Sequence, residues 1–213
     1  MLTVYEMEAL MIYIRILDTK NLIGADILEA VRSLPFGKAE ADRLLSLRGD
    51  TRRLESLGAL IALRDILPSN KATAEIARDS DNGKPYFKDT SMPHFSLAHS
   101  CGICTAVTAD AEVGIDIELI RPVPHKNELA KRFFTEDEKQ RLRKSDTDEN
   151  FLLIWTQKEA LVKMHGDSLA CSLGKPLPHA NCVLCDVIDL GTQRLAITVC
   201  SALDDKISIS IAN

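Results

Sequence analysis

The sequence lacks three features that would each define a class of protein. It has no excess of basic residues, since 26 Lys and Arg against 31 Asp and Glu give a net charge of −5, whereas a nucleic-acid-binding domain is basic. Its N-terminus carries Glu6 and Glu8 where a secretory signal would be basic. Its longest stretch without Asp, Glu, Lys or Arg, 90–109, contains Pro93 and His99 and is a poor bilayer span. We therefore expect a cytoplasmic protein that binds neither nucleic acid nor membranes.

Six cysteines are present, and they include two Cys-x-x-Cys pairs, Cys101/Cys104 and Cys182/Cys185. Four thiolates in two such pairs could bind zinc. The pairs are far apart in the sequence, however, and each lies in a strand-like run, where residues three apart point to opposite faces. A redox pair at Cys101 would need a helix after it, but 105–109 is strand-like. We expect reduced thiols that pack, without zinc or redox function.

Hydrophobic periodicity and turn residues predict the order of the elements. They are a buried strand at 11–17, a helix capped by Asp50 or Thr51 that ends before Pro68, a turn at 81–85, strands at 101–109 and 112–119, a helical region at 127–165, and strands at 182–190, 194–201 and 206–212. Helices segregated from antiparallel-looking strands indicate an α+β fold. The order repeats in outline, which predicts two similar α+β halves, 1–109 and 110–213, related by a pseudo-twofold axis.

Two carboxylates share one face of the strand at 112–119. Its alternation places Gly114, Asp116 and Glu118 on the face opposite Val113 and Ile115. The two acidic residues would lie about 7 Å apart at Cα, and they repel each other unless water or a cation lies between them. Two interpretations remain: an amphipathic strand with its acidic residues in water, or a site for a hard cation such as Mg²⁺.

A third carboxylate follows on a helix. Trp155, Glu159 and Lys163 are spaced four apart and so share a face. The spacing also suits a surface Glu–Lys pair, but the only tryptophan of the chain would face inward and draw the other two toward a cleft. Further along this region, Thr135 and Glu138 form a capping-box pattern.

A segment at 95–100, Phe-Ser-Leu-Ala-His-Ser, follows the turn residues Gly83-Lys84-Pro85. Its His99 has small hydroxyl neighbours and could hold phosphate oxygens, or it could be a structural histidine.

In this order the motifs resemble the 4′-phosphopantetheinyl transferases, of the larger type that activates surfactin synthetase. The motifs are 83–85, 95–100, 114–118, 132–135 and 155–163, and the resemblance covers roughly residues 80–170. One departure is Ala98, where the family usually has Ser, which would remove a hydroxyl contact to the cofactor. The resemblance implies a single chain of two α+β halves, acting as a monomer with its site between them.

The resemblance also implies an activity and its residues. The family transfers the phosphopantetheine arm of coenzyme A to a serine of an apo acyl or peptidyl carrier protein. Asp116, Glu118 and Glu159 would bind Mg²⁺ or Mn²⁺. The catalytic residues would be Glu159, Lys163 and Glu138, with Glu159 or Glu138 as the general base. The residues that contact coenzyme A would be Lys84, Pro85, His99, Ser100, Asp116, Lys163 and Arg53, and Arg53 is preferred over Lys38 and Arg52.

Two other functions remain as alternatives: a module that binds coenzyme A or a carrier protein without turnover, and a metal-dependent phosphohydrolase. For an acidic carrier protein we expect a basic and apolar docking surface at Lys126, Lys131 and Arg132, leading into Phe133 and Phe134. A solvated helix face is the alternative for that run.

Overall fold

A computed structural model describes residues 11–68, 74–167, 181–202 and 206–211 of the chain. The described helices are α1 (Ile27–Arg32), α2 (Lys38–Ser46), α3 (Asp50–Ile66), α4 (Lys126–Phe133), α5 (Glu136–Lys144) and α6 (Asp148–His165), with a 3₁₀ turn at Thr19–Leu22. The strands are β1 (Met11–Asp18), β2 (Ile76–Arg78), β3 (Pro85–Phe87), β4 (His94–Ser100), β5 (Ile103–Ala109), β6 (Val113–Leu119), β7 (Asn181–Asp189), β8 (Arg194–Ser201) and β9 (Lys206–Ile211).

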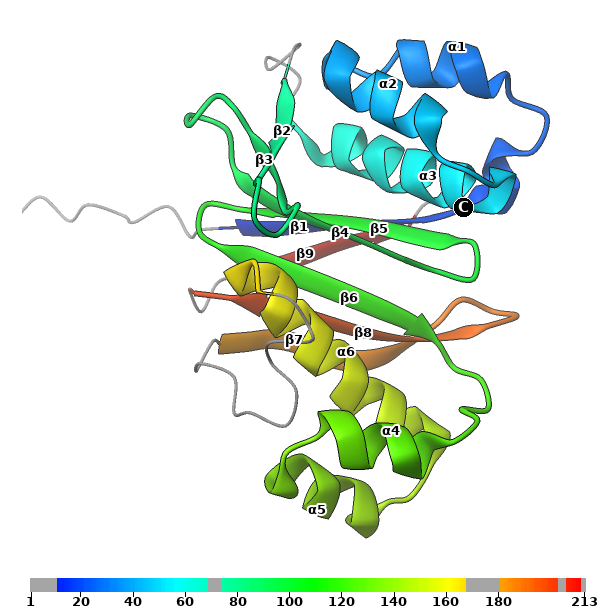
Figure 1. Ribbon diagram of the computed structural model, residues 1–213, viewed down its shortest axis with the longest axis vertical. Helices are drawn as coiled ribbons and strands as arrows, with labels where there is room; N and C mark the ends of the chain where they lie inside the picture. Colours follow the sequence, from blue (N-terminus) through cyan, green and yellow to red (C-terminus); the bar gives the residue numbers. More distant parts are fainter. Residues whose placement is uncertain (1–10, 69–73, 168–180, 203–205, 212–213) are drawn as a thin grey trace, which may run out of the picture.

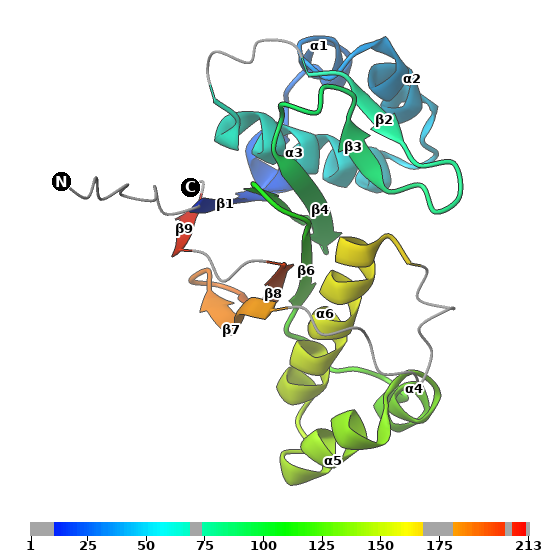
Figure 2. The ribbon, with the colours of Figure 1, turned by 90° about the vertical axis from the view of Figure 1, so that its left-hand side faces the viewer.

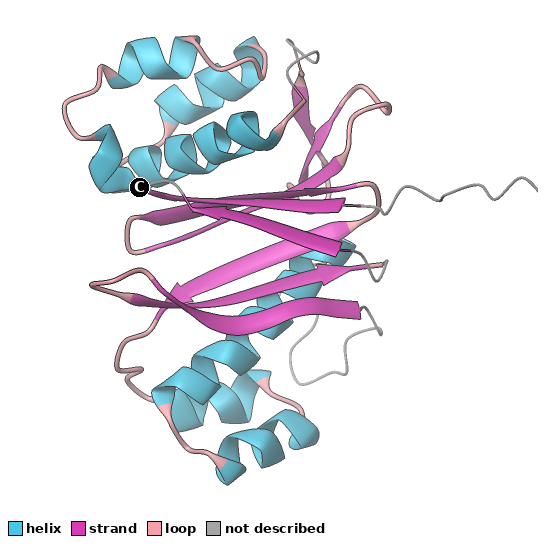
Figure 3. Cartoon of the chain, turned by 180° about the vertical axis from the view of Figure 1, so that it is seen from behind, coloured by secondary structure: helices cyan, strands magenta, loops and turns pink. Residues whose placement is uncertain are grey.

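Two sheets lie between two groups of helices (Figure 1 and, from behind, Figure 3). The first sheet has the order β4-β5-β1-β9 and is covered by α1–α3, the second has the order β6-β8-β7 and is covered by α6 with α4 and α5, and β2–β3 form a separate hairpin. Neighbouring strands run antiparallel, except that β9 lies parallel to β1. The predicted α+β fold with antiparallel sheets is confirmed.

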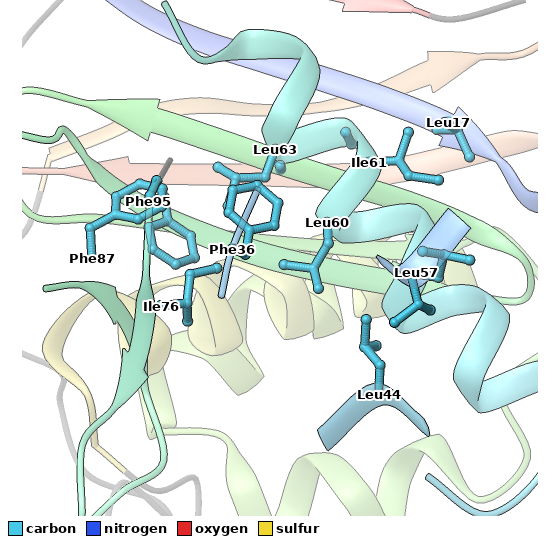
Figure 4. Close-up of a cluster of buried hydrophobic side chains, with 14 of the residues drawn as sticks. Leu17, Phe36, Leu44, Leu57, Leu60, Ile61, Leu63, Ile76, Phe87 and Phe95 are labelled. Atoms are coloured by element: carbon cyan, nitrogen blue, oxygen red, sulfur yellow. The ribbon is translucent and has the colours of Figure 1, made fainter. Parts of the chain in front are cut away.

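The core beneath α3 follows from the spacing of its leucines. Leu57, Leu60 and Leu63 lie three residues apart and are buried on one face of the helix, beside the aromatic residues of the same core (Figure 4). The rings of Phe87 of β3 and Phe95 of β4 are in contact, tilted by 43° with their centroids 4.5 Å apart. This core therefore fixes the β2–β3 hairpin and β4 against α3.

The two sheets share a second core made mainly of isoleucines. Ile12, Ile14 and Ile16 of β1 pack with Ile115 and Ile117 of β6 and with residues of β8. The alternation leaves the opposite face of β1 partly open, with Tyr13 46% exposed. The composition of β1 predicted a strand that is buried throughout. This prediction is wrong, because one face of β1 is partly exposed.

Serine side chains join the sheets where β6 lies beside β4. The Ser96 hydroxyl accepts a hydrogen bond from the Ile115 amide (3.2 Å), and the Ser100 hydroxyl accepts one from the Leu119 amide (3.3 Å). These bonds satisfy amides at the edge of β6 that the ladder with β8 does not use. They also fix His99 of β4 relative to the acidic residues of β6.

Two expected boundaries are wrong. Gly49, with φ 88°, is the N-cap of α3 and makes no side-chain hydrogen bond, so Asp50 and Thr51 lie inside the helix instead of capping it. The strand expected from residue 101 begins at Ile103, because Cys101 and Gly102 form the β4–β5 turn with φ 49° and 85°.

The division of the chain into halves at 109/110 stays a proposal, and β9 pairs with β1 across that division. None of the described helices is both long and apolar enough to cross a membrane.

Candidate active site

Helix α6 lies directly against β6 because a glycine occupies the contact (Figure 2). A Cβ at Gly114 would overlap the carbonyl oxygen of Ala160 and lie 2.6 Å from the backbone nitrogen of Met164. Any other residue would push the helix away from the strand. The glycine thus allows the acidic face of β6 to approach Glu159 and Lys163.

Asp116 is buried and paired with a lysine. The Lys163 ammonium donates a 2.7 Å hydrogen bond to Oδ1 of Asp116. Burial raises the pKa of Asp116, and Glu118 adds to this rise, while Lys163 opposes it. An amphipathic strand with its acidic residues in water is therefore wrong for Asp116.

Glu159 faces the same group of charges. Its pKa is raised first by burial and then by the negative charges of Asp116 and Glu118, while Lys163 lowers it. Glu118 accepts a 2.8 Å hydrogen bond from the Ser100 hydroxyl. Asp116, Glu118 and Glu159 therefore form a carboxylate cluster, with Lys163 beside Asp116 and Glu159 and the Arg121 guanidinium 3.9 Å from Glu118.

The carboxylate cluster fits a divalent cation by its chemistry. Its donors are all carboxylate oxygens, which Mg²⁺ and Mn²⁺ prefer. A bound cation would also reduce the electrostatic repulsion between the three carboxylates. As the side chains stand, no group of three His, Cys, Asp or Glu residues within the described ranges forms a ready metal site. Binding would require the Lys163–Asp116 pair to rearrange.

A basic cavity of about 330 Å³ opens beside the carboxylate cluster. Helices α2 and α3, the β2–β3 hairpin, β4 and α6 form its walls. Its lining includes the basic side chains of Arg43, Arg52, Arg78, Lys84, His99 and Lys163, and one acidic residue, Asp167. Such a cavity attracts a multiply charged anion.

Of the predicted coenzyme A contacts, Lys84, Pro85, His99 and Lys163 line this cavity. Lys84 Nζ also bonds to Glu112 Oε2 (2.5 Å) and to the Met164 carbonyl (2.6 Å). Lys84 therefore ties the β2–β3 hairpin to the end of α6, and its ammonium lies where both elements meet.

The Nδ1 side of the His99 ring faces an acidic residue, Glu55, that the sequence motifs did not identify. Its Nδ1 lies 3.2 Å from Oε2 of Glu55, on α3. Burial lowers the pKa of His99, as do Lys163 and Arg52, while Glu55 and Glu118 raise it. No local motif marks Glu55, because the pairing joins α3 to β4 and is long-range.

Three other predicted contacts do not line the cavity: Arg53, Ser100 and Asp116. The Arg53 guanidinium bonds to Asp50 (3.2 Å) and to the Leu47 carbonyl (2.7 Å), whereas its neighbour Arg52 does line the cavity. Ser100 is buried between β4 and β6, where it contacts Glu118. Ala98 is likewise buried in the core shared by the sheets, so a hydroxyl there would face that core.

Glu138 caps the N-terminus of α5 and pairs with a lysine of α6. With Thr135 it forms the predicted capping box, in which Oε2 accepts from the Thr135 amide at 2.7 Å. Both of its oxygens also accept from Lys158 Nζ, at 3.0 and 3.1 Å, and this lysine is only 1% exposed. The pair joins α5 to α6, and the sequence analysis assigned no role to Lys158.

The expected docking surface is only partly available. Lys126 bonds to Asp146 (2.9 Å) and Asp148 (3.3 Å), and Phe134 is buried. Accessible basic and apolar groups remain in 131–133, where the Arg132 guanidinium lies 5.2 Å from the centroid of the Phe133 ring.

The described cysteines are free thiols. Cys101 lies in an exposed turn, whereas Cys104 is buried, with its pKa raised to about 12 mainly by burial. A bulge between Cys182 and Leu184 shifts the register of β7 against β8. Cys182 therefore lies opposite Cys200 and Cys185 opposite Thr198, which are two residues apart and share a face of β8. The expectation that this second pair points to opposite faces is therefore wrong.

Comparison with known proteins points to the same part of the chain as the carboxylate cluster and α6. Residues 112–207 match the model of the 4′-phosphopantetheinyl transferase superfamily. The chain is 37% identical over 95 residues to the 4′-phosphopantetheinyl transferase psf-1 of Bacillus pumilus (43% of this chain, 40% of the relative) and 35% identical over 94 residues to Sfp of Bacillus subtilis (43% and 41%). AcpT of Salmonella typhimurium is 33% identical over 127 residues (57% and 64%).

The matched stretch spans about two fifths of the length of the first two of these relatives. It contains the carboxylate cluster and α6. The inferred resemblance is confirmed: this part of the chain matches the 4′-phosphopantetheinyl transferase superfamily.

Proposed function

We propose that the chain transfers the 4′-phosphopantetheine group of coenzyme A to a serine of an apo acyl or peptidyl carrier protein. The other product is adenosine 3′,5′-bisphosphate. One observation carries the proposal: Lys163 lines the basic cavity and also hydrogen-bonds to Asp116 of the carboxylate cluster. A pyrophosphate bound in the cavity would therefore lie next to the carboxylate cluster. The match of residues 112–207 to the superfamily supports the same activity.

The reaction is a displacement at the phosphorus that carries pantetheine. A bond forms from the serine oxygen to this phosphorus, the bridging P–O bond to the nucleotide breaks, and the serine loses its proton. Catalysis of this kind depends on alignment and on neutralising charge. Lys84, His99 and Lys163 are suited to bind phosphate oxygens from the cavity wall.

The metal ligands in this proposal are Asp116, Glu118 and Glu159. Mg²⁺ or Mn²⁺ bound there would neutralise charge on the pyrophosphate. Two features of the carboxylate cluster support the assignment: its all-oxygen donor set, and the raised pKa of Asp116 and Glu159, which burial and then the neighbouring carboxylates cause.

Glu159 is the proposed general base, acting directly or through a water molecule. Its raised pKa brings it closer to the working pH, where a base is most effective. Glu138 has weaker support in this role, because Thr135 and Lys158 already donate to its oxygens.

Further parts of the proposal concern the partner and the setting. We expect the carrier protein to dock transiently on the exposed basic side chains of Lys131 and Arg132, beside Phe133. We expect the chain to act as a monomer in the cytoplasm, with the cavity between its halves. In support, α3 and β4 precede the division at 109/110 and α6 follows it, and all three line the cavity.

One incubation tests the function. The chain, coenzyme A, Mg²⁺ and an apo carrier protein are combined, and the carrier is measured by intact mass. A gain of one phosphopantetheine group is expected, and a carrier with its acceptor serine replaced by alanine should gain nothing. Release of adenosine 3′,5′-bisphosphate without that gain would indicate a phosphohydrolase. No change in either would indicate a binding module.

A further inference from the structure

The carboxylate of Glu55 is held in a fixed position between α3 and the β4–β5 hairpin. Its side chain is 12% exposed, and its Oε1 accepts a 2.8 Å hydrogen bond from the Gly102 amide in the β4–β5 turn. Its own carbonyl accepts from the Cys104 thiol at 3.2 Å. With one oxygen and its backbone tied to this hairpin, Oε2 has little freedom, and it lies 3.2 Å from Nδ1 of His99.

We propose that Glu55 is a positioning residue for phosphate recognition: it keeps a proton on Nδ1 of His99 and leaves Nε2 to take up a proton when a phosphate group binds. The inference rests on the proposed function, because it assumes that the basic cavity receives the phosphate groups of coenzyme A. It concerns how the cavity recognises them, and it assigns a role to a residue outside all the sequence motifs.

The hydrogen-bonding capacity of the two side chains explains why a carboxylate is needed. An ionised carboxylate only accepts hydrogen bonds, so the ring nitrogen facing Glu55 must carry a proton. In the neutral ring the other nitrogen, Nε2, is then an acceptor and cannot donate to a phosphate oxygen. Binding of a phosphate through Nε2 therefore requires the imidazolium form, and the bond formed is charge-assisted.

The surrounding charges indicate that the free ring is mostly neutral. Burial lowers the pKa of His99, and the cations Lys163 on α6 and Arg52 on α3 lower it further, against the opposing effects of Glu55 on α3 and Glu118 on β6. Above the ordinary histidine pKa of about 6.5 the ring of the free protein is then uncharged. An arriving phosphate raises the pKa again, so the proton is taken from solvent on binding.

Glu55→Gln changes this proton balance while keeping the size of the side chain. The amide oxygen of Gln can still accept from Gly102, but its NH₂ group would face Nδ1 as a donor. The neutral ring would then carry its proton on Nε2, which donates to phosphate without taking up a proton. The exchange replaces a charge-assisted hydrogen bond by a neutral one.

Calorimetry in two buffers of different ionisation enthalpy measures this uptake. The probe is adenosine 3′,5′-bisphosphate at about pH 7.5, one unit above the ordinary histidine pKa. Wild type is expected to take up close to one proton per ligand. Glu55→Gln is expected to take up almost none and to bind about 10-fold more weakly, because a neutral hydrogen bond to phosphate is weaker than a charge-assisted one. Asp65→Asn removes an acidic residue from the other end of α3 and should behave as wild type.

Each outcome decides between the two proposals. Unchanged uptake in Glu55→Gln would overturn the role of Glu55 and leave the proposed function standing. Failure of wild type to bind the bisphosphate would overturn the proposed function and this inference with it. Should Glu55→Gln fold poorly, ¹⁵N NMR of the wild-type histidines, with His99→Gln to assign the signal, gives the tautomer directly. A neutral His99 protonated on Nε2 would contradict the inference.

Discussion

Replacing Glu159 by Gln should separate the proposed chemistry from the structural role of α6. In the folded chain, burial and the charges of Asp116 and Glu118 raise the pKa of Glu159. The folded state therefore binds more protons at this group than the unfolded state, so its ionisation destabilises the fold as pH rises from the unfolded pKa through the folded pKa. Gln carries no charge to desolvate. At neutral pH we expect Glu159→Gln to be as stable as wild type or more stable.

The gain in stability is small and the loss of activity large. A change outside the core is worth up to about 1 kcal/mol, which for a chain of this size raises the Tm by about 2–4 °C. Below the ordinary carboxyl pKa the difference should vanish, because Glu159 is then protonated in both states. The transfer rate should fall by at least about 10²-fold, as for loss of a general base, and further if cation binding is weakened.

Two measurements on each variant, the Tm and the transfer rate by intact mass, test this prediction. Glu149→Gln is the matched control, because Glu149 lies in the first turn of α6 and pairs with Arg194 at 2.8 Å. It should lower the Tm slightly and leave the rate unchanged. A Glu159→Gln protein that transfers at the wild-type rate would refute the role of Glu159. One that melts far below wild type would refute the electrostatic reasoning.

Three further predictions address the cation, the thiols and the buried pair, and a fourth the partner. Transfer should stop in excess EDTA, return with Mg²⁺ or Mn²⁺ and survive a zinc-selective chelator; full activity in EDTA would contradict the cation site. Replacing all six cysteines by Ala or Ser should leave the rate largely intact, and a selective loss with an unchanged Tm would reopen a role for the thiols. Lys158→Met should cost about 3 kcal/mol by denaturant unfolding, because Glu138 loses its partner, and adding Glu138→Gln should recover part of that loss. Charge reversal at Lys131 and Arg132 should raise the KM for carrier protein several-fold at low salt, and an unchanged KM would exclude this surface.

Local periodicity was enough to predict which residues share a face. A period of two put Asp116 and Glu118 together, and a spacing of four put Glu159 and Lys163 together, as the structure shows. It could not predict that Asp116 is buried, because that depends on α6 covering the strand. The cover depends in turn on Gly114, whose contact with α6 is long-range.

The errors arise where one residue of register matters. Successive residues on a helix point about 100° apart, so the preferred Arg53 turns away from the cavity, whereas its neighbour Arg52 lines it. The bulge in β7 brought Cys182 and Cys185 to one side, which regular alternation does not allow. Glu55 was missed for another reason: its partners lie on β4 and in the next turn, and no local pattern marks them.

The most direct test of the account is a crystal structure of the chain with Mn²⁺ and coenzyme A, using the anomalous signal of manganese. We predict one manganese peak bonded to Asp116, Glu118 and Glu159, with the phosphates of coenzyme A in the cavity lined by Lys84, His99 and Lys163. Displacement of Lys163 from Asp116 should accompany binding. Manganese bound elsewhere with the three carboxylates unchanged, or coenzyme A outside this cavity, would contradict the proposed site.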